Sequence, residues 1–142
     1  MIKKCGPWLI VILLALGQYA CASKEEKRDT YIKKGEALIA QEDYKRARLE
    51  FQNSLKIYPD FALAYYKLGY CESKLENWNK AFSYFNKAVE LDPELWEAQL
   101  ALAEIYIASD QIDRAKKTID LVPAGQPQHL KTMVLKRQLY IK

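Results

Sequence analysis

The stretch Phe61–Pro93, FALAYYKLGYCESKLENWNKAFSYFNKAVELDP, decides how the rest of the chain folds. A shift of 34 residues in either direction brings back its pattern of small and large apolar residues. The residues that fall in register are Gly35, Gly69 and Ala103; Ala47, Ala81 and Ala115; Phe51, Phe85 and Ile119; and Pro59, Pro93 and Pro127. A fixed period of this length indicates an array of stacked repeats.

Within this stretch, the spacing of the apolar residues predicts two helices joined by a short turn. Tyr65, Leu68 and Gly69 lie three and four residues apart, which places them on one face of the first helix. Trp78 opens the second helix, and Pro93 closes the unit because proline disfavours helical geometry in the residue before it. Five glycines and five prolines are too few for the frequent turns of an all-β fold, so we expect an all-α chain.

The pattern resembles the tetratricopeptide repeat (TPR) family, most closely in the stretch quoted above and more weakly toward the C-terminus. The resemblance implies an α-solenoid of about three helix-turn-helix units, stacked into a right-handed superhelix. The units are expected at about 28–61, 62–95 and 96–127, after a polar linker at 22–28.

The third unit departs from the pattern at its end. Pro123 comes early, so we expect a shortened second helix that ends near Leu121. Residues 128–142 then predict one more amphipathic helix, which would cap the exposed apolar face of the array. Alternatively, this helix is the first of a fourth unit in a longer natural chain.

The N-terminal segment, residues 1–21, has the features of a secretory signal peptide. Lys3 and Lys4 supply a positive start, and Trp8–Leu16 is an uninterrupted apolar run. This run is shorter than the roughly 20 residues that a membrane-spanning helix needs. Extending it over residues 6–22 gives a marginal span, so an uncleaved N-terminal membrane anchor stays open as an alternative.

Cys21 lies just past the apolar run and resembles the lipidated cysteine of bacterial lipoproteins. In that family the cleaved cysteine carries a thioether-linked diacylglycerol and an N-acyl chain, and more than one acyl signal makes anchoring stable. The resemblance is incomplete because Gln18 stands where the family usually has leucine. The alternatives are a plain secretory site cut before Ser23, or a cysteine without a role.

The residue after the cysteine is Ala22 rather than aspartate. By resemblance to Gram-negative lipoproteins, this implies attachment to the outer membrane, facing the periplasm. An uncleaved anchor would instead hold the chain in the inner membrane, and Lys3 and Lys4 favour an N-terminus on the cytoplasmic side.

The composition offers little for catalysis, metal binding or nucleic-acid binding. His129 is the only histidine, and no second histidine or cysteine stands at a metal-ligand spacing. Cys71 is the only thiol of the repeats and reads as a small buried apolar residue. The net charge is +4, part of it from Lys3 and Lys4, which is too little to predict nucleic-acid binding. We therefore expect no enzymatic activity, no cofactor, no metal and no small-molecule substrate.

The concave surface of a TPR array is lined mainly by the first helix of each unit and binds peptides or helices of partner proteins. Carried onto this chain, the resemblance assigns the partner-binding groove to Ile32, Glu36, Tyr66, Tyr70, Leu100 and Glu104. These residues would form an apolar and aromatic stripe beside two acids, in which tyrosine offers contact area at low entropic cost. Alternatively, Tyr66 and Tyr70 pack on each other or against the C-terminal helix folded back into the groove.

TPR proteins that clamp the terminal carboxylate of chaperone tails use lysine, arginine and asparagine at groove positions. This chain carries aspartate, glutamate, tyrosine and aliphatic residues there, so we do not expect a carboxylate clamp. By resemblance, we expect an envelope-anchored, non-enzymatic adaptor that supports assembly of a secretion, pilus, polysaccharide-export or outer-membrane complex. The alternative is an adaptor on an uncleaved anchor that recruits soluble client proteins.

Overall fold

The computed structural model describes residues 8–123 and 129–141, with side chains described for 24–123 and 131–139. All regular structure in these residues is helical, which confirms the predicted all-α class. The helices are α1 (Trp8–Ala40), α2 (Tyr44–Ile57), α3 (Ala62–Lys74), α4 (Trp78–Leu91), α5 (Trp96–Ala108), α6 (Ile112–Asp120) and α7 (His129–Ile141).

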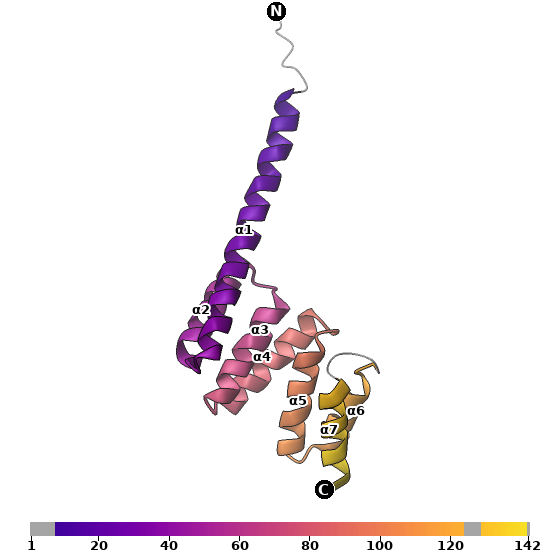
Figure 1. Cartoon of the computed structure of the whole chain (residues 1–142). Coiled ribbons are helices and arrows are strands. Elements are labelled where there is room, and N and C mark those ends of the chain that lie inside the picture. The colour runs from indigo at the N-terminus through magenta and orange to yellow at the C-terminus, as the bar shows by residue number, and fades with distance from the viewer. Residues whose placement is uncertain (1–7, 124–128, 142) are drawn as a thin grey trace, which may run out of the picture.

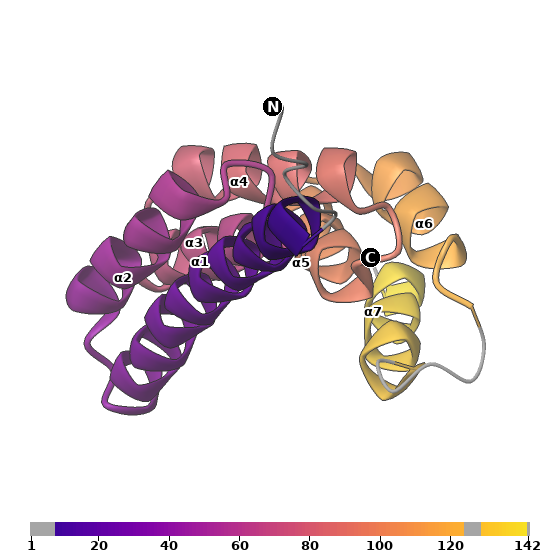
Figure 2. The same cartoon turned by 90° about the horizontal axis from the view of Figure 1, so that it is seen from above.

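The first six helices form three antiparallel pairs that stack side by side into a curved solenoid (Figure 1). Helices α1, α3 and α5 line the inner side of the curve, and α2, α4 and α6 form its outer side (Figure 2). We call the contact of the pair α1–α2 with the pair α3–α4 the first interface. The contact of the pair α3–α4 with the pair α5–α6 is the second interface.

The first two pairs are held together by close packing at the position where the period places a glycine. A Cβ atom added to Gly35 would lie 2.5 Å from the ring of Phe51, and one added to Gly69 would lie 2.6 Å from the ring of Phe85. Both phenylalanines are almost fully buried, so their rings cannot move aside without cost. The small residue is therefore a steric requirement of the helix pair.

The turns inside the three pairs repeat as faithfully as the helices do. Glu42, Glu76 and Asp110 are spaced 34 residues apart, and each has a positive φ, of 59°, 61° and 61°. After each of them, an N–H reaches back five residues to a carbonyl of the first helix, as from Asn77 to Glu72 at 2.9 Å. This is the hydrogen-bond pattern that ends a helix in a left-handed residue.

Helix α1 is uninterrupted from Trp8 to Ala40 and extends well past the solenoid (Figure 1). The residues of the predicted polar linker, 22–28, are therefore helical and continuous with the first unit. The reason lies in their composition, because lysine, glutamate and arginine are good helix formers and no proline interrupts the segment. The predicted signal or anchor segment, 1–21, with Cys21, lies outside the residues whose side chains are described.

The junction of α1 with the first unit is fastened by Arg28. Its Nε donates to Asp29 Oδ1 at 2.7 Å, and its guanidinium lies 4.4 Å from the centre of the Phe61 ring and 5.0 Å from that of Tyr58. Cation–π contacts of this kind contribute about 0.5–1 kcal/mol each at partly exposed sites. They connect α1 to the loop between α2 and α3.

The C-terminal end differs from the rest of the array. Helix α6 has 9 residues where α2 and α4 have 14, the shortening that Pro123 predicts. Helix α7 packs against α5 and α6, where Leu135 is buried together with Leu100 and Ile119. Among the residues with described side chains, no helix is both long and apolar enough to cross a membrane.

Candidate functional site: an aromatic pocket at the second interface

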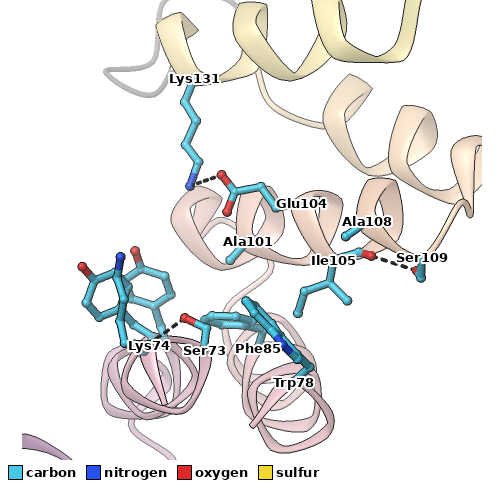
Figure 3. A pocket seen from close by; sticks show the side chains of 12 residues that line it. Ser73, Lys74, Trp78, Phe85, Ala101, Glu104, Ile105, Ala108, Ser109 and Lys131 are labelled. Atoms are coloured by element: carbon cyan, nitrogen blue, oxygen red, sulfur yellow. Dashed lines mark hydrogen bonds and ion pairs between the residues drawn. The ribbon is translucent and has the colours of Figure 1, made fainter. Parts of the chain in front are cut away.

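A pocket of about 670 Å³ opens between α3, α4 and α5, with α7 at its edge (Figure 3). It is lined by Tyr66, Tyr70, Ser73, Lys74, Trp78, Phe85, Ala101, Glu104, Ile105, Ala108, Ser109 and Lys131. Most of these residues come from α3 and α5, while Trp78 and Phe85 come from α4 and Lys131 from α7, so the pocket joins the concave surface to the second interface.

Aromatic rings form one wall of the pocket. The ring of Tyr66 lies 5.9 Å from that of Phe85, and Phe85 is buried in the core of the second unit. Trp78, the first residue of α4, is 56% exposed. A large apolar side chain that stays open to solvent beside a pocket is the usual form of an anchor point for a partner.

Ala101 and Ile105 of α5 face this aromatic wall (Figure 3). Ala108 and Ser109 continue the same side, and the Ser109 hydroxyl donates to the Ile105 carbonyl at 2.8 Å. Because that hydroxyl is satisfied within its own helix, this side of the pocket offers mainly apolar contact.

The charges around the groove are largely paired. Lys67 Nζ lies 2.7 Å from Glu36 Oε1 across the first interface, and Lys131 Nζ lies 3.0 Å from Glu104 Oε1 across the mouth of the pocket. Lys74 Nζ lies 5.4 Å from the centre of the Tyr70 ring and forms no ion pair with any described residue. The pocket therefore has an excess of positive charge at its edge.

Two titratable groups near the site stay neutral at physiological pH. Burial, followed by the negative charge of Glu97, raises the pKa of the Tyr66 phenol to about 12, so Tyr66 keeps its proton and can donate a hydrogen bond. Burial raises the pKa of the Cys71 thiol to about 12 as well. A thiol with such a pKa is a poor nucleophile, because the thiolate is the reactive form.

The structure brings together only part of the groove that the resemblance implied. Tyr66, Tyr70 and Glu104 line the pocket, whereas Glu36 lies on the groove at the first interface, paired with Lys67. The placement of Ile32 and Leu100 on the groove surface is corrected, since they are 7% and 0% exposed.

The reason is the packing that each helix receives from its neighbours. Ile32 belongs to the apolar cluster of Phe51 and Leu68. Leu100 belongs to the cluster completed by Leu135, which α7 supplies. The same repeat position is therefore buried in the first and third units, as Ile32 and Leu100, but lines the pocket in the second, as Tyr66. The side chains of the neighbouring helices decide between the two.

Most pocket residues lie outside the six groove residues that were predicted, and three of these supply the unpredicted charges or the exposed ring of the pocket. Trp78 is on a second helix, Lys74 is at the end of α3, and Lys131 comes from α7. The signal for Trp78 is visible in the sequence, because its register partner Tyr44 is also aromatic. No pattern in the sequence brings Lys131 to the pocket, since α7 lies outside the matched period.

A metal site is not formed by the side chains that are described. Within residues 24–123 and 131–139, no group of three or more histidines, cysteines, aspartates or glutamates lies close enough to hold a metal ion. The carboxylates of the groove are instead engaged with lysines, as described above.

Comparison with known proteins places these features in a family. Two sequence models described as tetratricopeptide repeat match residues 32–95 and 74–134, which together span most of the solenoid. The tetratricopeptide repeat-containing protein trd-1 of Caenorhabditis elegans is 28% identical over 85 residues, or 60% of this chain. The protein CTR9 homolog of Arabidopsis thaliana is 31% identical over 80 residues, or 56% of this chain. The matched region covers only 11% and 7% of these two proteins.

Solved structures show the same fold at low sequence identity. The TPR2B domain of yeast Sti1 in its pHsp70 complex is 20% identical, with a TM-score of 0.75 over 82% of this chain and 98% of that domain. The first TPR of Spaghetti (RPAP3) bound to the HSP90 peptide SRMEEVD is 19% identical, with a TM-score of 0.75 over 82% and 94%.

A bacterial structure is similar too. The type III secretion chaperone SycD of Yersinia enterocolitica, in complex with a peptide of the translocator YopD, is 14% identical, with a TM-score of 0.71 over 80% of this chain and 89% of that one. Solenoids of stacked helix pairs typically use their concave surface to bind other proteins. The chain belongs to the tetratricopeptide repeat family.

Proposed function

We propose that this protein is a non-enzymatic scaffold that binds a peptide or a helix of a protein partner in its concave groove, with the pocket of Trp78 as the main contact. The observation that carries the proposal is the 56% exposure of Trp78 beside an open pocket. Tryptophan and tyrosine dominate the binding energy of protein interfaces, and Tyr66 and Tyr70 line the same pocket.

The form of the ligand follows from the shape and charge of the groove. The solved neighbours described above hold peptides on the same fold, which supports an extended or helical peptide as the ligand. A terminal carboxylate is a poor fit here, because Glu36 and Glu104 occupy groove positions and already pair with Lys67 and Lys131. We expect recognition through an internal segment of the partner.

We also propose a cellular location for this scaffold. Cys21 follows an apolar N-terminal run, which supports a lipoprotein of the bacterial envelope that is anchored to the outer membrane and faces the periplasm. A scaffold at that place would support assembly of a secretion, pilus, polysaccharide-export or outer-membrane complex. The continuous helix α1 would hold the groove at a defined direction from the anchor.

Site-specific photocrosslinking in a Gram-negative host that carries the native operon tests the binding function. Trp78→p-benzoylphenylalanine should crosslink to one defined protein, identified by mass spectrometry. The matched control is Lys45→p-benzoylphenylalanine, which places the same group at an exposed position of α2 on the outer side of the curve. Equal crosslinking from both positions, or none from Trp78, contradicts a specific groove ligand.

Intact mass and membrane fractionation test the anchor. Loss of residues 1–20, a gain of lipid mass and an outer-membrane position, all abolished by Cys21→Ser, is the expected result. A full-length mass that Cys21→Ser does not change would instead favour the alternative, an uncleaved anchor in the inner membrane whose repeats recruit soluble client proteins.

A further inference from the structure

Each residue of the pocket at the second interface can be compared with the residue 34 positions earlier. For the α5 side of the pocket, these earlier residues lie on α3 and its cap, at the first interface. The pocket residues contributed by α5 and its cap match residues of α3 and its cap as follows: Ala101 with Lys67, Glu104 with Tyr70, Ile105 with Cys71, Ala108 with Lys74, and Ser109 with Leu75. All except Ile105 are smaller than their counterparts. On this side of the pocket, α5 therefore presents smaller side chains than α3 presents at the first interface.

Tyr70 shows what fills the equivalent volume at the first interface. Its ring meets the ring of Tyr44 edge-on, with 6.3 Å between the centres. At the second interface, Trp78 stands in the place of Tyr44 and Glu104 in the place of Tyr70. Glu104 turns to Lys131 instead, and among the described residues no aromatic ring stacks on Trp78.

The charge at the edge of the pocket further restricts the chemistry of the ligand. Glu104 and Lys131 neutralise each other, whereas Lys74 is exposed and has no acidic partner among the described residues. A carboxylate held next to the pocket would complete an ion pair with Lys74. Such a pair at the edge contributes modestly to affinity but favours one class of partner over others.

We propose that the pocket takes one aromatic side chain of the partner, whose ring meets Trp78 edge-on as the ring of Tyr70 meets that of Tyr44, and that an acidic residue next to that aromatic residue pairs with Lys74. This inference rests on the proposed function and specifies its ligand. The partner is a protein segment with an aromatic residue beside aspartate or glutamate, and the receptor site lies between two units.

Selection from a phage-displayed library of random dodecapeptides tests the inference on the full-length chain, immobilised in detergent micelles. The parallel selection uses Glu104→Tyr, which restores the tyrosine of the first interface and fills the pocket from within. We expect peptides enriched on the wild type to share an aromatic residue next to an acidic one, and to be missing from the selection on Glu104→Tyr.

The affinity of one enriched synthetic peptide for a set of variants then shows how much each contact contributes to binding. Trp78→Ala should weaken binding about tenfold or more, as loss of an interface hot spot does. Lys74→Met should weaken it about threefold, and this loss should shrink at high salt. Lys45→Met, which removes the same charge from an exposed position of α2 outside the pocket, should leave the affinity within about twofold of the wild type. Circular dichroism of each variant confirms its helical fold, and Ala108→Leu replaces Glu104→Tyr if the latter does not fold.

The outcomes distinguish this inference from the proposed function. Peptides that lack the aromatic residue, or that bind Glu104→Tyr as well as the wild type, overturn the pocket inference but leave a groove-binding scaffold intact. If no peptide is enriched on the full-length chain, the inference and the proposed peptide-binding function both fail.

Discussion

The first and second interfaces of this solenoid bring the same repeat positions together but are held together by different chemistry. At the first, Arg48 on α2 lies 3.3 Å from Glu72 on α3, and Glu72 is only 2% exposed. At the second, the positions one period later are Phe82 and Tyr106, whose rings meet edge-on at 5.8 Å.

The comparison shows how much freedom a repeat leaves to its side chains. Glu72 is also an acceptor for Asn77 Nδ2 at 2.7 Å, so each of its oxygens has a partner. An ion pair satisfied in this way and an aromatic pair of similar size can hold the same junction. The period determines which two positions meet at an interface. The residues at these positions determine whether the contact is polar or apolar.

The largest expected effect is that of removing the acid of the first interface. Glu72→Ala leaves the Arg48 guanidinium and the Asn77 amide beside a small cavity, which should lower the free energy of unfolding by about 2–3 kcal/mol. Urea denaturation followed by circular dichroism measures this. The double variant Arg48→Phe with Glu72→Tyr copies the second interface and should recover more than half of the loss. If it is less stable than Glu72→Ala, the two interfaces are not interchangeable.

The next effect concerns the open second interface. Glu104→Tyr should raise the free energy of unfolding by about 1 kcal/mol, because the burial of an aromatic ring against Trp78 outweighs the loss of the exposed Lys131 bridge. The fluorescence of Trp78, read in a Trp8→Phe, Trp96→Phe background, should shift to shorter wavelength as its exposure falls. Unchanged stability and fluorescence would mean that the pocket cannot accommodate a ring at this place.

Alkaline pH should affect both interfaces, each through its own buried group. The pKa values of Cys71 and Tyr66 are both raised to about 12, from ordinary values of 9 and 10. The unfolded chain therefore loses these protons first, so stability is fully present below pH 9 and falls as pH rises from there toward 12. Cys71→Ala should remove the part of the fall that begins near pH 9, and Tyr66→Phe the part that begins near pH 10. Thermal unfolding at a series of pH values, with the same slope in both variants and the wild type, would contradict this assignment.

The smallest expected effect is that of the bridge across the pocket mouth. Lys131 and Glu104 are 43% and 49% exposed, so Lys131→Met should cost about 0.5 kcal/mol or less. Lys67→Met breaks the Lys67–Glu36 bridge of the first interface, where Lys67 is 21% exposed, and should cost slightly more. Denaturant midpoints of the two variants compare the bridges directly. A larger loss for Lys131→Met would show that α7 is held mainly by this contact.

The fold could be predicted from the sequence because each level of the pattern agrees with the others. Gly35 and Gly69 recur at the period, the phenylalanines that need that space recur with them, and the left-handed turn residues Glu42, Glu76 and Asp110 follow the same spacing. The early end of α6 before Pro123 could also be predicted, because proline interrupts a helix through its own backbone.

The site was only partly predictable. Tyr66, Tyr70 and Glu104 were expected on the groove and do line the pocket, but Ile32 and Leu100 are core. Their burial depends on atoms brought by other helices, and a positional rule for one helix contains no information about its neighbours. The same limit explains why the approach of Lys131 from α7 could not be predicted.

By itself, the sequence determined that the chain forms a periodic stack of helix pairs, because spacing, small residues and turn residues act over short stretches of chain. Only the tertiary structure decided which residues of the groove remain accessible. Trp78 stays exposed because the small side chains of Ala101 and Ala108 share the pocket with it. Leu100 is buried because it packs in one cluster with Leu135 of α7. Whether a side chain becomes surface or core is set by the volume of what packs against it, and that quantity exists only once the helices are assembled.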